Sequence, residues 1–399
     1  MKPPPGSTTL AKPYVVFSDD WGEHPSSSQH IVRQISLDHR VAWVNTVGMR
    51  RPQLNLVDLR KGMRKLSGMG RRTSVQVTDI PHPEFAVHRP TMIPYNTVAA
   101  IRRFNCMSAQ RTLKRLRVQF ADTRPIVLTT VPNSCDYVDA IPTEKIVYYC
   151  VDDFSEWPGL DKSLVLEMEA ALIEKADTLV ATSPKLYEKL AASGKPTFLL
   201  THGVDIEHFS GEAAVELPDL NGISSPRIGY FGLFDDRSDK ELIENLARRM
   251  PQVSIVVAGR VETDVDRLKR LPNLHFTGNV PYALLPCLIK GLDLLFIPYQ
   301  VNALSESLSP LKLKEYLATG LPVISTPIDA VREFSDCIET ASSVDEWCDK
   351  VATLLNGRRA GRRGAMVKRL AGEGWPEKAK IMNAICHGWV GEGASTLSR

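Results

Sequence analysis

The chain has 399 residues, of which 43% are hydrophobic and 24% are charged, and its formal net charge is +3. This length is natural for two domains, and the composition is that of an ordinary globular protein, which argues against a disordered or fibrous chain. No apolar run approaches the length of a membrane span, and no internal repeat of the solenoid type is present.

The cysteines and the first residues indicate the compartment. Seven cysteines are present, an odd number without a C-x-x-C pair, which predicts reduced thiols in a cytoplasm rather than disulfides or a zinc site. Residues 1–12 have no apolar core of the kind that a signal peptide needs, so we expect a disordered leader there. The predicted location is cytoplasmic, with peripheral attachment to the inner face of the cell membrane as an open alternative.

Short apolar runs alternate with helical patterns along the chain, which predicts an α/β fold with doubly wound parallel sheets. In the first half, strands are expected at residues 14–17, 41–44, 126–129, 146–150, 178–181 and 197–199, with helices at 164–175 and 184–192. In the second half, strands are expected at 228–231, 253–258, 292–297 and 323–326, with helices at 239–250 and 375–390. The turn-rich stretch 210–226 is expected to link a first domain at 13–209 to a second at 227–374, followed by a terminal helical segment at 375–399.

Polar residues follow two of the strands expected in the first half. Asp20, Trp21 and His24 come after the first strand, and Asp152 and Asp153 come after the strand at 146–150. Because ligands bind at the carboxyl ends of parallel strands, these side chains are candidates to line a ligand site. One acid of the pair is expected to be functional, and the other to cap the following loop. A surface loop with a packed tryptophan is the alternative for the first group.

Basic residues gather at residues 50–72 and 102–117, although the net charge is small. In the second cluster, cations alternate with apolar residues at helical spacing. Two interpretations remain open, namely a solvated helix face and a surface for anionic lipid headgroups. Nucleic acid is disfavoured as a partner, because aromatic stacking positions and a known binding motif are lacking.

Glycines end the first strand of the second domain. Gly232 closes the run G-Y-F-G at 229–232, and glycines at a strand's carboxyl end let a ligand approach the backbone closely. The run is not G-x-G-x-x-G, so a dinucleotide-dependent dehydrogenase is disfavoured. Arg237 and Lys240 follow in the next loop.

The most informative segment is a short helix with both ends marked. Ser309 is a good N-cap, Pro310 suits the first helical position, and Gly320 suits the C-terminal cap. Lys312 and Glu315 lie three residues apart and share a face. The helix N-terminus and Lys312 suit a phosphate, and Glu315 can accept hydrogen bonds from a sugar diol such as ribose. A nucleoside diphosphate offers both groups, whereas a capped helix with two solvated charges is the plain alternative.

The run P-L-K-L-K-E-Y-L-A-T-G-L-P-V at 310–323 resembles the nucleotide-sugar site of GT-B glycosyltransferases of family 4. It is similar in particular to the bacterial teichuronic-acid glycosyltransferase subgroup. Family 4 carries two glutamates separated by seven residues. Glu315 matches the second of them, and Ser307 occupies the position of the first. The resemblance extends from the first strand to the terminal helix.

This resemblance implies two Rossmann-like domains that face each other across a cleft, with the terminal helix crossing back to the first domain. It also implies a nucleoside-diphosphate sugar as co-substrate, retention of anomeric configuration, no other cofactor and no metal. The basic residue for the diphosphate would be Arg237 or Lys240, and Val280 lies where relatives hold the nucleobase by backbone groups. The donor-binding positions are then Gly232, Arg237, Lys240, Val280, Ser307, Ser309, Leu311, Lys312 and Glu315.

The sequence therefore predicts a glycosyltransferase whose acceptor is a lipid-linked saccharide of a cell-surface polymer or exopolysaccharide. Asp152 and Asp153 are the catalytic candidates, and Asp20, Trp21 and His24 are the acceptor-binding ones. Two alternatives remain open. One is a non-catalytic nucleotide-sugar-binding subunit, which the serine at position 307 suggests, and the other is a GT-B epimerase or phosphorylase.

Overall fold

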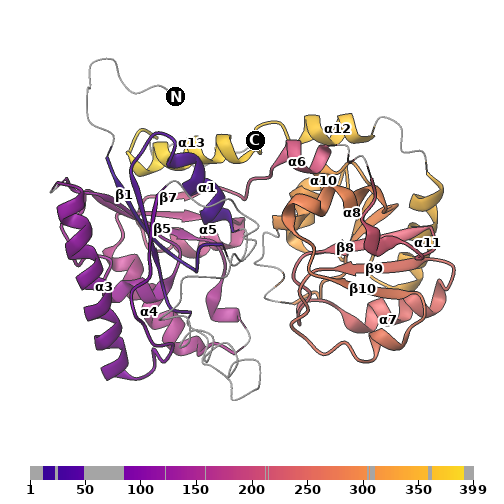
Figure 1. The fold of residues 1–399 in the computed structure, drawn as a ribbon, viewed down its shortest axis with the longest axis horizontal. Coiled ribbons are helices and arrows are strands. Elements are labelled where there is room, and N and C mark those ends of the chain that lie inside the picture. Colours follow the sequence, from indigo (N-terminus) through magenta and orange to yellow (C-terminus); the bar gives the residue numbers. More distant parts are fainter. Residues whose placement is uncertain are drawn as a thin grey trace. The chain divides into compact units, whose positions relative to one another are not determined.

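The computed structural model describes residues 12–22, 26–48, 85–121, 123–157, 159–211, 213, 215–302, 305, 311–357 and 362–390 (Figure 1). Contacts divide the chain into two units, one that runs to Leu200 and resumes at Ala379, and one that spans Thr201–Lys378. Each unit contains one parallel sheet with helices around it. All seven cysteines are free thiols.

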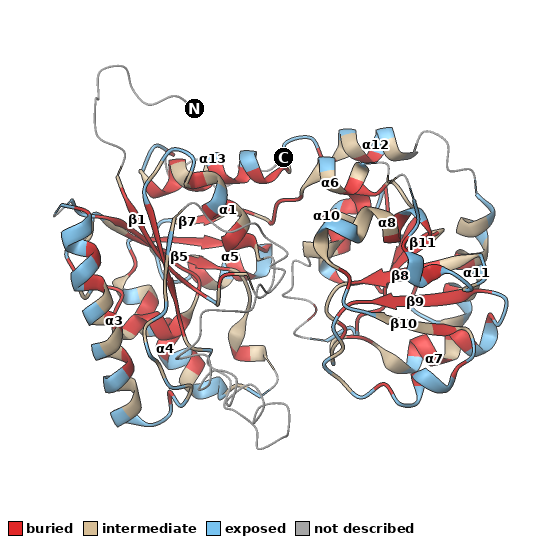
Figure 2. Ribbon diagram, viewed as in Figure 1, coloured by how far each residue is buried: buried red, intermediate tan, exposed pale blue. Residues whose placement is uncertain are grey.

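The first unit contains a seven-stranded sheet in the order β3-β2-β1-β4-β5-β6-β7, and every pairing in it is parallel. Its elements are β1 (Tyr14–Ser18), α1 (Ser27–Ile35), β2 (Val41–Asn45), β3 (Ala86–His88), α3 (Ala99–Gln119), β4 (Ile126–Thr129), η1 (Pro132–Asp136), β5 (Lys145–Cys150), η2 (Phe154–Glu156), α4 (Lys162–Lys175), β6 (Thr178–Ala181), α5 (Pro184–Ala191) and β7 (Thr197–Leu199). Strands β1, β2 and β4 are buried along their whole length, as expected of apolar runs covered on both faces (Figure 2).

The second unit contains a six-stranded parallel sheet in the order β10-β9-β8-β11-β12-β13. Its elements are α6 (Ile206–Ser210), η3 (Pro218–Leu220), β8 (Arg227–Phe231), α7 (Lys240–Arg249), β9 (Ser254–Ala258), η4 (Leu268–Arg270), β10 (Leu274–Gly278), η5 (Tyr282–Leu284), α8 (Leu285–Lys290), β11 (Leu294–Ile297), α10 (Leu311–Ala318), β12 (Val323–Ser325), η6 (Asp329–Phe334), β13 (Glu339–Thr340), α11 (Val344–Asn356) and α12 (Arg362–Arg369). Both sheets are doubly wound, as the sequence predicts.

Capping side chains fix where several helices begin. The carboxylate of Asp161 before α4, the hydroxyl of Ser183 before α5 and the carboxylate of Asp239 before α7 each accept a hydrogen bond from a backbone N–H of the first turn. Such caps satisfy N–H groups that have no partner inside the helix. None of the helices that the structure describes is both long and apolar enough to cross a bilayer.

The boundary between the units lies earlier than the expected linker at 210–226. Val204 and Phe209, from the predicted end of the first domain, and Leu217 and Leu220, from the predicted linker, are buried in the core of the second unit. These four apolar side chains anchor an otherwise polar, turn-rich stretch. Residues 201–226 therefore belong to the second unit.

The terminal helix α13 (Trp375–Cys386) packs with the first unit from Ala379 onward. The Tyr14 hydroxyl on β1 donates a hydrogen bond to Asn383 Oδ1 at 2.6 Å, and Lys145 Nζ on β5 donates to the carbonyl oxygen of Ile385 at 3.0 Å. The predicted return of the terminal helix to the first domain is therefore confirmed.

Candidate functional site

In the second sheet the strand order reverses between β8 and β11. In doubly wound sheets this reversal opens a crevice at the carboxyl ends of the two strands, where ligands bind. Gly232 directly follows β8, and Tyr299 lies just after β11. The backbone is crowded here, since Gly232 (φ +118°) donates its N–H to the carbonyl of Ala258 at 2.9 Å, and a Cβ at Gly259 (φ +139°) would lie 2.0 Å from the Gly232 oxygen.

This crowding predicts a large loss of stability for Gly259→Ala. The added Cβ would meet backbone that cannot rotate away, at a φ that other residues rarely adopt. We expect the free energy of unfolding to fall by about 3 kcal/mol or more in urea titrations. Gly194→Ala is the matched control, because Gly194 also has a positive φ (+75°) but open space around it, and about 1 kcal/mol is expected there. Equal losses in the two variants would contradict the crowding.

Lys312, on α10, places its ammonium group beside Gly232. The Nζ atom lies 4.1 Å from the centre of the Tyr230 ring and 5.3 Å from that of Tyr299, and it donates a hydrogen bond to the Tyr230 hydroxyl. A Cβ at Gly232 would be 3.2 Å from Lys312 Nζ. The two tyrosine rings therefore hold one cation at the carboxyl end of β8.

Arg237 supplies a second cation at the same place. Its guanidinium binds both carboxylate oxygens of Asp235, with Nε to Oδ1 at 2.9 Å and Nη2 to Oδ2 at 2.8 Å, which fixes its orientation. It lies 5.8 Å from the centre of the Tyr299 ring. Burial alone would raise the pKa of Tyr299, but Lys312 and Arg237 outweigh burial and leave that pKa below its usual value. The two cations therefore place positive charge beside the Tyr299 ring.

Glu315 lies one helical turn after Lys312, on the same face of α10, and is half-buried. Burial raises the pKa of its carboxyl group to about 7, while nearby Lys312 acts in the opposite direction. Among the residues that the structure describes, no donor makes a hydrogen bond to this carboxyl group. The site thus combines two fixed cations with one acceptor group that is available to a ligand.

The other residues predicted to bind the nucleotide sugar lie in different surroundings. Lys240 contacts Asp236 at 3.2 Å and Thr263 at 2.6 Å, so its ammonium group is engaged away from the two tyrosines. The side chain of Val280 packs in the core of the second unit. Leu311 is the first residue of α10 and is half-buried. Ser307, Ser309 and, in the first unit, His24 lie outside the described residues.

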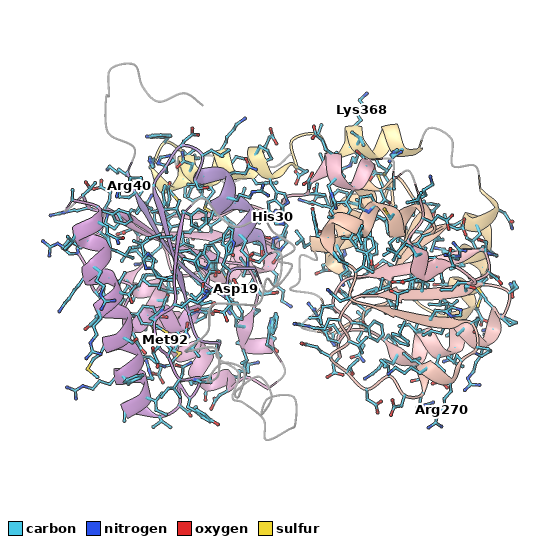
Figure 3. All side chains as sticks on the ribbon, in the orientation of Figure 1. Asp19, His30, Arg40, Met92, Arg270 and Lys368 are labelled. Carbon is cyan, nitrogen blue, oxygen red and sulfur yellow. The ribbon has the colours of Figure 1, made fainter. Side chains whose placement is uncertain are left out.

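The first sheet also reverses its order, between β1 and β4. The hydroxyls of Ser18 and Thr130 meet there at 2.7 Å, and Asp20 accepts a hydrogen bond from Asn45 Nδ2 at 2.7 Å. Asp19 and His30, labelled in Figure 3, come from the loop after β1 and from α1. A group of polar side chains thus lies at the switch point of the first unit, where Ser18 and Thr130 are buried and Asp20 is half-buried.

The ring of Trp21 does not join these polar side chains, contrary to the sequence-based expectation. The side chain is only 7% exposed, and its ring packs edge-on against Trp43 and Phe85, with ring centres 4.8 and 4.9 Å away. An aromatic cluster of this kind stabilises the fold by burying apolar surface. The alternative of a packed tryptophan in a loop is the one that the structure supports.

The paired acids after β5 have different environments. Asp153 caps η2 by accepting hydrogen bonds from the backbone N–H and the hydroxyl of Ser155, and it forms an ion pair with Lys189 at 3.1 Å. Burial alone would raise the pKa of Asp153, but Ser155 and Lys189 outweigh burial and lower it. Asp153 is thus engaged in the cap of η2 and in an ion pair, and Asp152 is half-buried just after β5.

Sequence reasoning missed Tyr230, Tyr299 and Asp235, which hold the two cations. Their place in the sequence could have indicated them, because each lies at or just beyond the end of β8 or β11.

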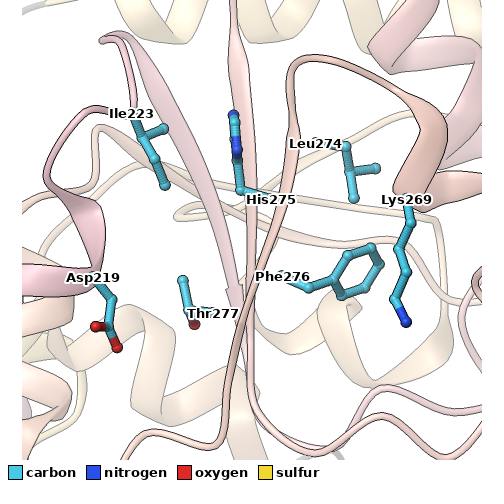
Figure 4. A pocket seen from close by; sticks show the side chains of 7 residues that line it. All are labelled: Asp219, Ile223, Lys269, Leu274, His275, Phe276 and Thr277. Carbon is cyan, nitrogen blue, oxygen red and sulfur yellow. The ribbon is translucent and has the colours of Figure 1, made fainter.

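A surface hollow of about 510 Å³ lies elsewhere, beside the edge strand β10, and contains none of the predicted site residues (Figure 4). It is lined by Asp219, Ile223, Lys269, Leu274, His275, Phe276 and Thr277. Within the described ranges, no group of three or more His, Cys, Asp or Glu side chains could hold a metal ion.

Comparison with known proteins connects this geometry to a family. A family model described as "Glycosyl transferases group 1" matches residues 225–357. TuaH of Bacillus subtilis, which is named a teichuronic acid biosynthesis glycosyltransferase, is 28% identical over 176 residues. That match covers 41% of this chain and 44% of TuaH, so it spans less than half of either protein.

Solved structures resemble the chain over nearly its whole length. Sucrose-phosphate synthase from Thermosynechococcus elongatus has a TM-score of 0.67 at 15% identity, and covers 95% of this chain and 99% of its own. Anabaena HepE in complex with UDP and glucose has a TM-score of 0.63 at 11% identity, and covers 94% of this chain and 99% of its own. Together with the two doubly wound sheets, these matches show that the chain has the GT-B fold, that residues 225–357 are similar to group 1 glycosyl transferases, and that part of the chain is similar to a teichuronic-acid glycosyltransferase.

Proposed function

We propose that the protein is a glycosyltransferase that moves a sugar from a uridine-diphosphate sugar to an acceptor. The observation that carries this proposal is the convergence of Lys312 and Arg237 on Tyr299 beside Gly232, at the switch point of the second sheet. Two oriented cations suit a diphosphate, and a glycine lets it approach the backbone. The HepE structure, which contains UDP and glucose, supports uridine as the nucleoside.

The chemistry that these residues supply is stabilisation of the leaving group. When the bond between the sugar and the diphosphate breaks, negative charge develops on the diphosphate. Lys312 and Arg237 are held in place before the reaction by Tyr230 and Asp235, so little reorganisation is needed as that charge forms. Retention of configuration and independence of a metal are further parts of the proposal, and they rest on the family resemblance.

Glu315 is assigned to the ribose hydroxyls of the donor. Glu315→Gln should weaken UDP binding by roughly 1–3 kcal/mol, the range for losing a hydrogen bond to a charged group. Since only the ionised carboxylate accepts from both hydroxyls and its pKa is about 7, the difference between the two proteins should be small at pH 6 and largest at pH 8. Calorimetric titration at both pH values checks this. An equal affinity of the two proteins at pH 8 would remove Glu315 from the site.

The acceptor is proposed to be a lipid-linked saccharide of a surface polymer, bound at the switch point of the first unit with Asp152 facing its hydroxyl. The similarity to TuaH, which is named for teichuronic acid biosynthesis, supports a polymer of this class. A subunit that only binds the donor would show UDP affinity without transfer, and an epimerase would return an isomerised donor sugar. The fixed cations beside Gly232 favour a reaction in which the diphosphate leaves.

A lipid-linked acceptor would be met at a bilayer, and α3 offers a surface for docking there. Residues 85–121 contain no acidic side chain. The exposed residues of α3 combine cations with large apolar side chains, namely Arg103, Phe104, Met107, Arg111, Lys114, Arg115, Arg117 and Val118. Arg102 from the predicted cluster is instead paired with Asp136 at 2.7 Å. The basic cluster at 50–72 lies outside the described residues.

Binding to vesicles tests this docking surface. Each basic residue near an anionic membrane contributes about 1 kcal/mol, and salt screens it. Changing Arg111, Lys114 and Arg115 together to Gln should therefore lower the partition onto phosphatidylglycerol vesicles at least tenfold in flotation assays. The control changes three exposed cations of the second unit to Gln, namely Lys269, Arg270 and Arg332. If wild type binds neutral and anionic vesicles equally, α3 is a solvated helix and not a docking surface.

A further inference from the structure

A buried cluster of charged side chains connects α10 to both ends of the second unit. Lys314, which is 4% exposed, donates through Nζ to Thr201 Oγ1 at 2.9 Å, to the carbonyl of His202 at 2.6 Å and to the carboxylate of Glu373. Lys378, which is 1% exposed, donates to the same Glu373 carboxylate at 2.8 Å and to Thr201 Oγ1 at 3.1 Å. Two ammonium groups thus share one carboxylate and one hydroxyl.

The cluster lies where the chain enters and leaves the second unit. Contacts assign Thr201 and Lys378 as the first and last residues of that unit. The entering and leaving segments are also paired through their backbones, because the Val204 N–H donates to the carbonyl of Glu373 at 2.9 Å. Lys314 is therefore the point at which α10 holds both segments.

Lys314 is not needed to balance charge in the cluster. With a neutral side chain at position 314, Glu373 would still be paired with Lys378. Burial and repulsion by Lys378 lower the pKa of Lys314 to about 8, and attraction by Glu373 and Glu333 offsets them only in part. Burying a second ammonium group is costly for stability, so a role other than stability is indicated.

The neighbours of Lys314 on α10 suggest that role. Lys312 and Glu315, which form the proposed nucleotide site, lie two residues before it and one residue after it on the same rigid helix. We propose that Lys314 is a positioning residue that couples nucleotide binding at Lys312 and Glu315 to the paired segments 201–204 and 373–378. This inference rests on the proposed function, because the ligand is the nucleotide of that site.

Hydrogen exchange with and without UDP tests the coupling in the full chain. In wild type, UDP should slow amide exchange of segments 201–204 and 373–378. Lys314→Met should bind UDP with a Kd within threefold of wild type, while exchange in both segments no longer responds to UDP. Lys314→Arg should restore the response, because it keeps the charge and the donors. Lys269→Met, at an exposed lysine of the same unit, is the control and should respond as wild type does.

Kinetics give an independent readout. Lys314→Met should lower kcat at least tenfold with KM within threefold of wild type. Wild-type kcat should fall as the pH rises through about 8, since Lys314 then loses its proton, and this decline should be absent in Lys314→Arg. The coupling is overturned if wild type binds UDP without a change in amide exchange at segments 201–204 and 373–378. It is also overturned if UDP changes this exchange in Lys314→Met as it does in wild type. The proposed function stands in both cases. If wild type binds no UDP, both are overturned.

Discussion

Sugar transfer by a Lys312→Met variant is expected to be slower than wild type by roughly a hundredfold to a thousandfold, the loss seen when one donor to a developing oxyanion is removed. The ammonium group is held by Tyr230 and Tyr299 next to Gly232, where the departing diphosphate is proposed to lie. Methionine keeps most of the length of the side chain, so the packing of α10 should change little. Steady-state kinetics with a UDP-sugar measure the effect.

Binding measurements separate the phosphate role of Lys312 from a general loss of structure. The Lys312→Met variant should bind UDP more weakly than wild type, while its affinity for uridine, which has no phosphate, should be nearly unchanged. Lys269→Met is again the matched control and should retain wild-type turnover. If UDP and uridine lose affinity equally in Lys312→Met, Lys312 does not bind the diphosphate.

Asp152→Asn is expected to lower transfer by roughly a hundredfold or more, the range for a positioned general acid or base. Asp152 lies at the carboxyl end of the first sheet, and its neighbour Asp153 is already engaged with Ser155 and Lys189. UDP binding should stay near wild type, because the proposed nucleotide site lies in the second unit. Transfer rates and UDP titrations of the same preparation check both statements.

The neighbouring variant Asp153→Asn gives the matched comparison. It removes the charge that faces Lys189 and weakens the cap of η2, so thermal stability should fall while the kcat of the remaining folded protein stays within a fewfold of wild type. Full transfer activity in Asp152→Asn, or a larger catalytic loss in Asp153→Asn, would reverse the assignment of the two acids.

Much of the fold could be predicted from the sequence, because its central strands are continuous apolar runs. Strands β1, β4, β5 and β6 lie within one residue of their predicted bounds, since burial on both faces leaves a plain signal. Three of the four edge strands were missed, namely β3, β10 and β13, whereas the edge strand β7 lies at its predicted bounds. Strand β3 is three residues long and partly exposed, and β13 has two residues. Their pairing depends on neighbouring strands rather than on their own composition.

The site could be predicted only in part, because sequence places residues in elements but does not reveal which neighbours hold them. Lys312, Glu315 and Gly232 were found from the helix and the strand end, and these residues are clustered in the structure. Tyr230 lies on β8 and Tyr299 follows β11, and these two strands are adjacent only in the folded sheet. Trp21 was misassigned for the same reason, since its contacts with Trp43 and Phe85 join residues distant in the sequence.

The most direct test of the proposed activity is the release of nucleoside diphosphate from uridine-, guanosine- and adenosine-diphosphate sugars, compared between wild type and Lys312→Met. We expect wild type to release UDP from at least one uridine-diphosphate sugar, and the Lys312→Met variant to do so at least a hundredfold more slowly. Absence of release and of binding for every nucleotide sugar with folded wild-type protein would contradict the account.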